Sequence, residues 1–258
     1  MLSIGESRYL STLPLYSPLR ANLAPSQTLV LAGLTELTER LAAQNLDAGP
    51  IGVFEYFMAP ERFEILPGVA LSSLGRSLCV SLFSRRPAYE LANARIAVPF
   101  KATGPVALLR WLMREMYRFE PTLVPRKGDL KESMADNDGV LLFQDAALLA
   151  HAGTADLYHV WDLGEAWWQI TNTPLVYMLW ATRKGLPRTD FEAVERAFEQ
   201  ARTASPSMAG PIVEEAELRT SLPRPFLEGY FTRFQFECTA FQREGLELYR
   251  QTVANQAT

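Results

Sequence analysis

The sequence predicts an α/β fold, in which short buried strands alternate with amphipathic helices. Two observations predict it. Short runs rich in Val, Ile and Leu recur along the chain, with room for a helix between most of them. Helical periodicity is found in several of the intervening segments, while Pro and Gly are scattered as breaks rather than gathered in one linker. The 258 residues are enough for one large core or for two lobes of modest size.

Strands are expected wherever an apolar run is short and bounded by turn residues. The ordinary candidates are Leu2–Gly5, Leu29–Ala32, Pro50–Val53, Ala70–Ser73, Arg95–Val98, Gly139–Phe143 and His159–Leu163. Two longer apolar runs, Leu78–Phe83 and Pro174–Ala181, are typical of strands buried on both faces. They are either two central strands of one sheet or two strands at which the chain crosses between lobes, and periodicity leaves both open.

Helices are expected where apolar residues recur three and four positions apart. Leu34, Leu37 and Leu41 mark one such face, and a longer one begins near Gly104-Pro105. Two patterns typical of capping boxes, Thr189 with Glu192 and Thr239 with Gln242, predict the starts of two C-terminal helices.

Composition excludes several classes of function. The net charge of −4 is spread over mixed acids and bases, which argues against a nucleic-acid partner. No apolar run approaches the roughly 18 residues of a membrane span. The first residues lack the basic and apolar regions of a signal peptide, so we expect a cytoplasmic protein with no membrane partner.

Metal and cofactor sites are not predicted. Cys79 and Cys238 are expected to be buried free thiols, and His151 and His159 are too few for a histidine metal site or a Ser-His-Asp triad. The segment 136–139 has the composition of a calcium loop but not its length or closing Glu, so a turn is expected.

Six segments occur in an order that resembles the chorismate dehydratases of the futalosine route to menaquinone. They are R-Y-L-S-T-L-P-L from Arg8, L-D-A-G-P-I with E-Y from Leu46, L-F-S-R from Leu82, F-Q-D-A-A-L from Phe143, D-L-G-E-A-W from Asp162 and T-N-T-P-L-V-Y-M-L-W from Thr171. The resemblance extends from residue 2 to about residue 185.

The resemblance implies a type II periplasmic-binding-protein-like fold, with two α/β lobes and a ligand between them. One lobe would comprise residues 1–84 and 178–258 and the other residues 85–177, with crossover strands near 78–84 and 174–181. It also implies a hydro-lyase that removes water from chorismate, a dicarboxylate, to give 3-[(1-carboxyvinyl)oxy]benzoate without a metal or organic cofactor. Oligomeric state is not predicted.

This chemistry needs cations or helix N-termini for two carboxylates, a donor for the leaving hydroxyl and a base for the ring proton, which is either a protein carboxylate or the substrate's own side-chain carboxylate. Loops at the carboxyl ends of strands are where open α/β sheets bind ligands. The predicted catalytic residues there are Asp145, Ser11 and Thr12, and the predicted substrate-binding residues are Arg8, Glu55, Cys79, Lys101, Thr103 and Gly104.

Each candidate also has a structural interpretation. Asp145 has the position of a helix N-cap, Arg8 and Lys101 are ordinary solvated cations when taken singly, and Glu55 has the features of a structural partner.

The sequence departs from the family at polar positions. Ser11 replaces a usual Asn, Gly52 and Val53 replace paired Ser, and Cys79 replaces Ser. A site that loses hydrogen-bonding groups loses much of its selectivity for a ligand. Two alternatives to the chorismate lyase therefore remain open: a related enzyme for another carboxylated ligand, and a non-catalytic cytoplasmic binding protein.

Overall fold

A computed structural model describes residues 1–99, 103–126 and 128–255 and separates them into two compact units. Unit 1 comprises Met1–Ser72 and Val176–Leu246, and unit 2 comprises Ser73–Leu175 and the chain from Glu247 onward. The divisions fall inside three continuous elements, β4 (Phe63–Ser73), β10 (Leu175–Arg183) and α11 (Ala240–Tyr249).

The chain from Glu247 onward belongs to unit 2, whereas it was predicted to belong to the first lobe. The ring of Tyr249 lies 5.8 Å from that of Trp167, both in unit 2. Residues 80–84 were predicted to lie in the first lobe, within a crossover strand. They form a strand of unit 2 instead, because it pairs on both sides with strands of that unit.

Unit 1 is built on a six-stranded sheet of order β11-β4-β10-β3-β1-β2. β1 is parallel to both β2 and β3, and β10 is antiparallel to β3. Its strands besides β4 and β10 are β1 (Leu2–Ser7), β2 (Gln27–Ala32), β3 (Ala48–Gly52) and β11 (Phe234–Glu237). Its helices besides α11 are α1 (Leu13–Ala21), α2 (Leu34–Ala42), α3 (Val53–Met58), α8 (Arg188–Ala204), α9 (Ala209–Thr220) and α10 (Arg224–Phe231).

The buried hydroxyl of Tyr16 joins the main elements of unit 1. It donates to the carbonyl of Gly5 at 2.6 Å and accepts from Nε1 of Trp180 at 3.0 Å. The Tyr16 ring also meets Phe198 of α8 edge-on at 6.1 Å. Three elements around α1 are thus fixed by one side chain, at the point where β1 leads into the loop that follows it.

The Tyr16→Phe variant is expected to lower the free energy of unfolding by about 2–4 kcal/mol. The substitution removes one donor from the buried Gly5 carbonyl and the acceptor of the buried Trp180 indole N–H. Urea unfolding measures the loss. A loss below about 0.5 kcal/mol would show that water replaces the hydroxyl and that the bond does not join these elements.

Unit 2 is built on a five-stranded sheet of order β7-β6-β8-β5-β9. Strands β6, β7 and β8 are mutually parallel, and β5 is antiparallel to β8 and β9. The strands are β5 (Val80–Ser84), β6 (Arg95–Val98), β7 (Thr122–Pro125), β8 (Gly139–Phe143) and β9 (His159–Asp162). The helices are α4 (Thr103–Tyr117), α5 (Leu130–Ala135), α6 (Asp145–Thr154) and α7 (Leu163–Thr171), and a π-helical turn spans Arg250–Ala254.

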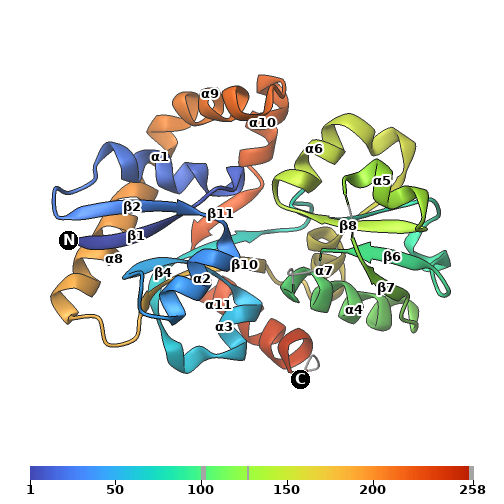
Figure 1. The fold of residues 1–258 in the computed structure, drawn as a ribbon, viewed down its shortest axis with the longest axis horizontal. Helices are drawn as coiled ribbons and strands as arrows, with labels where there is room; N and C mark the ends of the chain where they lie inside the picture. The colour runs from blue at the N-terminus through green and yellow to red at the C-terminus, as the bar shows by residue number, and fades with distance from the viewer. Residues whose placement is uncertain (100–102, 127, 256–258) are drawn as a thin grey trace. The chain divides into compact units, whose positions relative to one another are not determined.

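Helices cover both faces of the unit 2 sheet (Figure 1). On one face α5 and α6 pack on a cluster that includes Phe83, Val140 and Leu142. On the other face α4 and α7 pack together, with the rings of Trp111 and Trp167 5.3 Å apart. The central strands β5, β6 and β8 therefore lie between two helical layers, which explains their unbroken apolar runs in the sequence.

The predicted elements agree with the structure most closely in unit 2. Arg95–Val98 and Gly139–Phe143 are strands with the predicted bounds. The strand predicted at Leu78 begins only at Val80, because Leu78 has a left-handed backbone with φ of 61°. The strand predicted to reach Leu163 ends at Asp162, because that side chain caps α7.

Of the two predicted capping boxes, one is wrong. Thr189 lies inside α8, whose N-cap is Pro187. At the other, Gln242 accepts from the backbone N–H of Thr239, and Thr239 Oγ1 accepts from the N–H of Phe241. Strands β7 and β11 and helix α5 were not predicted, because each has only four to six residues.

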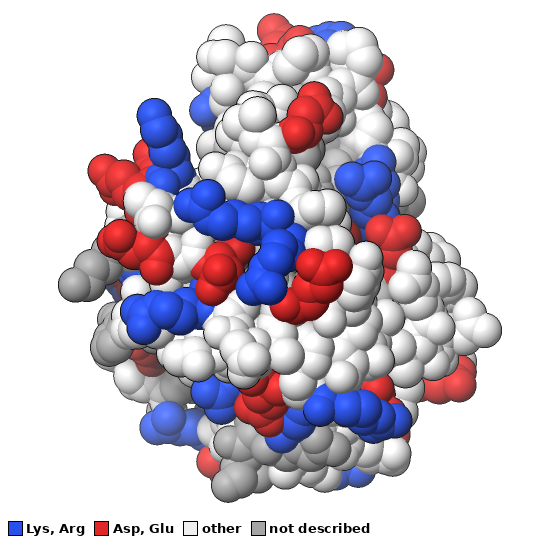
Figure 2. Space-filling view, turned by 90° about the vertical axis from the view of Figure 1, so that its right-hand side faces the viewer, with Lys and Arg blue, Asp and Glu red and all other residues white. Residues whose placement is uncertain are grey.

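Cys79 is buried and Cys238 half-buried, and both are free thiols, as predicted. Among the described residues, no three His, Cys, Asp or Glu side chains are grouped as metal ligands would be. None of the helices within the described ranges has the length and apolar character needed to cross a bilayer. On the face shown in Figure 2, basic and acidic side chains alternate and neither sign forms an extended patch.

Candidate functional site

In unit 1, the candidate residues gather at one edge of the sheet. β1 and β3 are parallel and both end there, so the loop after β1 and the start of α3 lie at the same edge. Arg8, Ser11 and Thr12 belong to the loop and Glu55 to the first turn of α3. The structure therefore brings these four residues to one edge, as expected for ligand-binding positions of an open α/β sheet.

The hydroxyl of Thr12 holds the turn that follows β1. It donates to the carbonyl of Tyr9 at 2.7 Å, with the Ser7 carbonyl 3.5 Å away. A hydroxyl has one proton to donate, so Thr12 has none left for a ligand. Ser11 is fully buried beside it, whereas Arg8 is exposed and forms no ion pair with the described residues.

The carboxylate of Glu55 lies over Gly52, one turn before it in the chain. A Cβ at position 52 would stand 2.0 Å from Oε2 of Glu55. The space that a serine would need at this position is therefore filled by the Glu55 side chain. The absence of a side chain at Gly52 therefore leaves the space in which the Glu55 carboxylate lies.

A network of charged side chains ties β1 to α1 and α9. Arg20 of α1 pairs with Glu6 at the end of β1 and with Glu215 of α9, which also pairs with Arg219. Burial raises the pKa of Glu6, while Arg20 opposes the change. Arg20 thus balances the charge of a buried carboxylate two residues before Arg8.

In unit 2, Asp145 and Cys79 come together at the carboxyl end of β8. β5 begins beside that end, and the N–H of Gln144 donates to the carbonyl of Cys79 at 2.6 Å. Asp145 follows and begins α6, so it lies in the first helical turn and is partly exposed. Gln144 itself has a left-handed backbone with φ of 54°, an unusual conformation for a residue other than glycine.

Cys79 is enclosed within unit 2. Its side chain is inaccessible, and burial raises the pKa of the thiol, with the Asp162 carboxylate contributing. The thiol therefore stays protonated near neutral pH, which excludes it as a thiolate nucleophile. Its backbone N–H is bound by the hydroxyl of Ser77 at 3.1 Å.

The buried carboxylate of Asp162 organises this end of unit 2. Its Oδ2 accepts from the N–H of Leu78 at 2.7 Å and of Ser77 at 3.2 Å, and its Oδ1 accepts from the N–H of Glu165 at 3.1 Å. Burial raises the pKa of Asp162, while these backbone donors favour the charged form. One side chain thus caps α7 and fixes the loop that leads to Cys79.

A second polar contact lies behind the same loop. The hydroxyl of Ser81 is 2.9 Å from Nε2 of His151 on α6, and Oδ2 of Asp162 is 3.5 Å away. All three side chains are buried. These contacts tie α6 and the loop before Cys79 to β5.

The remaining candidates lie before α4. Thr103 begins the helix and is exposed, and Gly104 is buried in its first turn. β6 is parallel to β8, so this helix starts at the same edge as Asp145. Lys101 lies outside the described residues.

Sequence reasoning did not assign a role to Asp162, Ser81, His151 or Gln144. A signal was present for the first of these, because Asp162 opens the D-L-G-E-A-W segment and an Asp three residues before a Glu is typical of a helix start. Ser81 and His151 lie 70 residues apart in the sequence, so their contact has no local signature.

Comparison with known proteins decides the family. Residues 2–255 match the family described as "Menaquinone biosynthesis". The chain belongs to this family.

A curated relative of this menaquinone-biosynthesis protein is the chorismate dehydratase of Thermus thermophilus. The two are 26% identical over 264 residues, covering 97% of this chain and 94% of the relative. The segments that predicted the family lie at the edges described above: the R-Y-L-S-T segment follows β1, and F-Q-D-A-A-L spans the end of β8 and the start of α6.

Solved structures show the fold. The AF1704 protein of Archaeoglobus fulgidus aligns with a TM-score of 0.77 at 16% identity, over 99% of this chain and 97% of the other. The Candida albicans CA3427 gene product, described as having the generic periplasmic binding protein fold, aligns with a TM-score of 0.70 at 11% identity, over 100% and 90%. The predicted periplasmic-binding-protein-like α/β fold is confirmed.

Proposed function

We propose that this protein is a cytoplasmic hydro-lyase that removes water from chorismate to give 3-[(1-carboxyvinyl)oxy]benzoate in menaquinone biosynthesis. The observation that carries the proposal is family membership over nearly the whole chain, together with a chorismate dehydratase that matches it end to end. The polar side chains at the carboxyl edges of the two sheets supply the groups that the reaction needs.

The reaction is a loss of one proton and one hydroxide from neighbouring ring carbons. A base takes the ring C–H proton, the electron pair of that bond forms the last double bond of the aromatic ring, and the hydroxyl leaves with a proton from a donor. Aromatisation makes the overall step strongly favourable. The protein therefore has to orient the ring and to place an acid and a base beside it.

In unit 2, Asp145 is the proposed carboxylate at the reacting carbons. It is the partly exposed acid at the end of β8, whereas Asp162 behind it is buried and fully engaged by backbone donors. Thr103, Gly104 and Lys101 are proposed to bind one carboxylate of the substrate. Cys79 contributes shape rather than charge, because its thiol is buried.

In unit 1, Arg8 is the proposed partner of a substrate carboxylate, since its guanidinium is exposed and has no ion pair among the described residues. Ser11 is the proposed hydroxyl donor to the leaving group. Thr12 is a positioning residue, because its only proton is bound to Tyr9. Glu55, which lies over Gly52, is proposed to orient the ring hydroxyl.

Thermal unfolding with chorismate, combined with chromatography of the same samples, tests the proposal. A ligand at about 100 times its dissociation constant adds about 2.7 kcal/mol of stability. We expect stabilisation together with consumption of chorismate. Stabilisation with chorismate recovered unchanged would instead indicate a binding protein, and absence of both effects in folded protein would contradict chorismate as the ligand.

A further inference from the structure

A hollow on unit 2 lies on the face of the sheet that α5 and α6 cover. Its volume is about 570 Å³, within the range of small-molecule pockets. The residues that line it are Arg126, Asp129, Leu130, Lys131, Leu142, Ala146, Leu149, Ala150, Thr154, Leu157 and Tyr158. Each of these described residues belongs to unit 2.

The hollow arises from small side chains on one face of α6. Ala146, Ala150 and Thr154 are spaced four residues apart, so they line up along the helix. On the opposite side α5 is a helix of only six residues and covers little of the sheet. Leu142 of β8 forms the floor between the two helices, where a larger side chain from α6 would otherwise pack.

The lining is more apolar than a surface normally is. Leu157 is 72% exposed and Leu149 45% exposed, and both border the hollow above the buried Leu142. Exposed large apolar side chains grouped around a concavity mark an interaction site more often than a plain surface. The occupant therefore has an apolar body.

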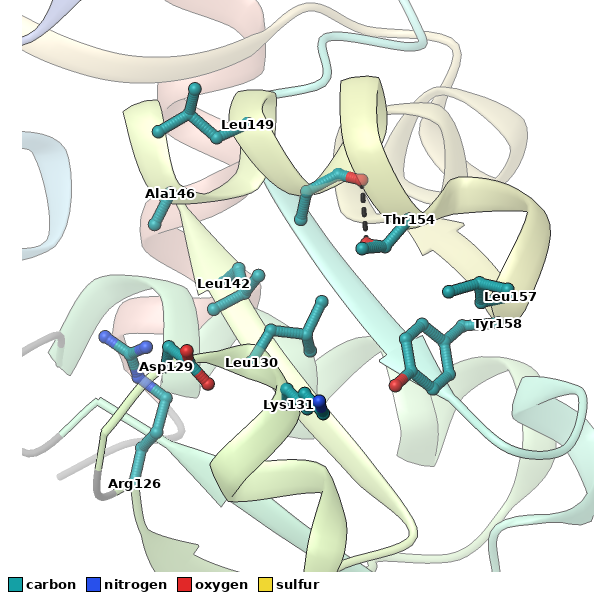
Figure 3. A pocket seen from close by; sticks show the side chains of 11 residues that line it. Arg126, Asp129, Leu130, Lys131, Leu142, Ala146, Leu149, Thr154, Leu157 and Tyr158 are labelled. Atoms are coloured by element: carbon teal, nitrogen blue, oxygen red, sulfur yellow. Dashed lines mark hydrogen bonds between the residues drawn. The ribbon is translucent and has the colours of Figure 1, made fainter. Parts of the chain in front are cut away.

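Charge is concentrated at one end. Figure 3 shows Arg126 and Asp129 at one end of the hollow and Leu157 and Tyr158 at the other, with Lys131 along the lower side. The described lining residues at this end carry two cations and one carboxylate, a net charge of +1, that is, +2 from Arg126 and Lys131 and −1 from Asp129. The carboxylate already accepts from the N–H of Glu132 at 2.8 Å, whereas neither cation forms an ion pair within the described ranges.

We propose that this hollow is a second binding site, lined by none of the described edge residues of the proposed reaction, for a small organic anion with one carboxylate and an elongated apolar body. The apolar body lies along Leu142 and the small face of α6, and the carboxylate is bound by Arg126 with Lys131 nearby. Charge complementarity and the apolar floor together select this class over a neutral compound or a polyanion.

The test uses 4-phenylbutyrate as the probe and the leucine methyl resonances of the intact protein as the readout. We expect saturable shifts at Leu142, Leu149 and Leu157, and binding about tenfold weaker for the neutral 4-phenylbutan-1-ol. Arg126→Met is expected to weaken the probe by about tenfold or more. Ala146→Phe, which fills the hollow from an exposed position, is expected to abolish binding.

Arg110→Met is the matched control, since it removes one exposed cation from α4 on the other side of the sheet and should leave binding unchanged. Three results would overturn the proposal: no saturable shift up to about 10 mM probe, equal affinity for the alcohol, or binding that survives Ala146→Phe. Concentration-dependent shifts of the same methyl groups without probe would also overturn it, because they would assign the hollow to a second copy of the chain.

Discussion

Replacing Asp145 with Asn is expected to lower kcat for chorismate dehydration by about 10²–10⁴-fold, the range lost when a positioned acid or base is removed. The amide keeps the size of the side chain and can still accept a hydrogen bond, but it cannot take the ring proton. α6 is tied to β5 by the contact between His151, in its second turn, and Ser81, so the variant should fold normally. Steady-state kinetics with far-ultraviolet circular dichroism measure both properties.

Asp156→Asn serves as the control for this variant. Asp156 is an exposed acid of the same unit, in the short turn after α6, and its loss should leave kcat unchanged. Full activity of Asp145→Asn would remove Asp145 from the reacting centre. The base would then have to be the substrate's own carboxylate or another protein group.

Replacing Asp162 with Ala is expected to lower the free energy of unfolding by about 3–5 kcal/mol. Three backbone N–H groups, those of Ser77, Leu78 and Glu165, lose their acceptor inside a buried part of unit 2. The loop before Cys79 and the start of α7 are both held by this carboxylate, so one substitution releases two segments. Urea unfolding gives the loss directly.

Asp129→Ala provides the comparison, because Asp129 also caps a helix through a bond to the third residue beyond it. That cap is exposed to water, so its removal should cost only about 1 kcal/mol. The difference between the two variants isolates the contribution of burial. Equal losses would contradict the central role assigned to Asp162.

The α/β class and the strands with unbroken apolar runs were predictable from local pattern alone. Gly139–Phe143 is recognisable because it is buried on both faces and bounded by turn residues. The short edge strands β7 and β11 were not, because four residues with partial burial give no distinct period. Backbone features such as the left-handed Leu78 depend on the distant Asp162 and have no local signal.

The candidate site was predictable in its sequence positions but not in its bonding. Sequence order places Arg8, Thr12 and Asp145 after strands, and the structure finds them at the carboxyl edges of their sheets. The bond from Thr12 to the Tyr9 carbonyl and the position of the Glu55 carboxylate over Gly52 each join residues three apart, but they depend on side-chain positions that the sequence pattern does not give. Because of the bond to Tyr9, we propose a positioning role for Thr12, which the sequence predicted to be catalytic.

Product analysis after incubation with chorismate is the most direct test of the central claim. The protein, in molar excess over chorismate, is sampled over time and analysed by liquid chromatography with mass spectrometry, beside Asp145→Asn and a protein-free sample. We predict an aromatic product one water lighter than chorismate, formed by the unaltered protein far faster than in either control. Chorismate decaying at the same rate in all three samples, with the protein shown to be folded, would contradict the account.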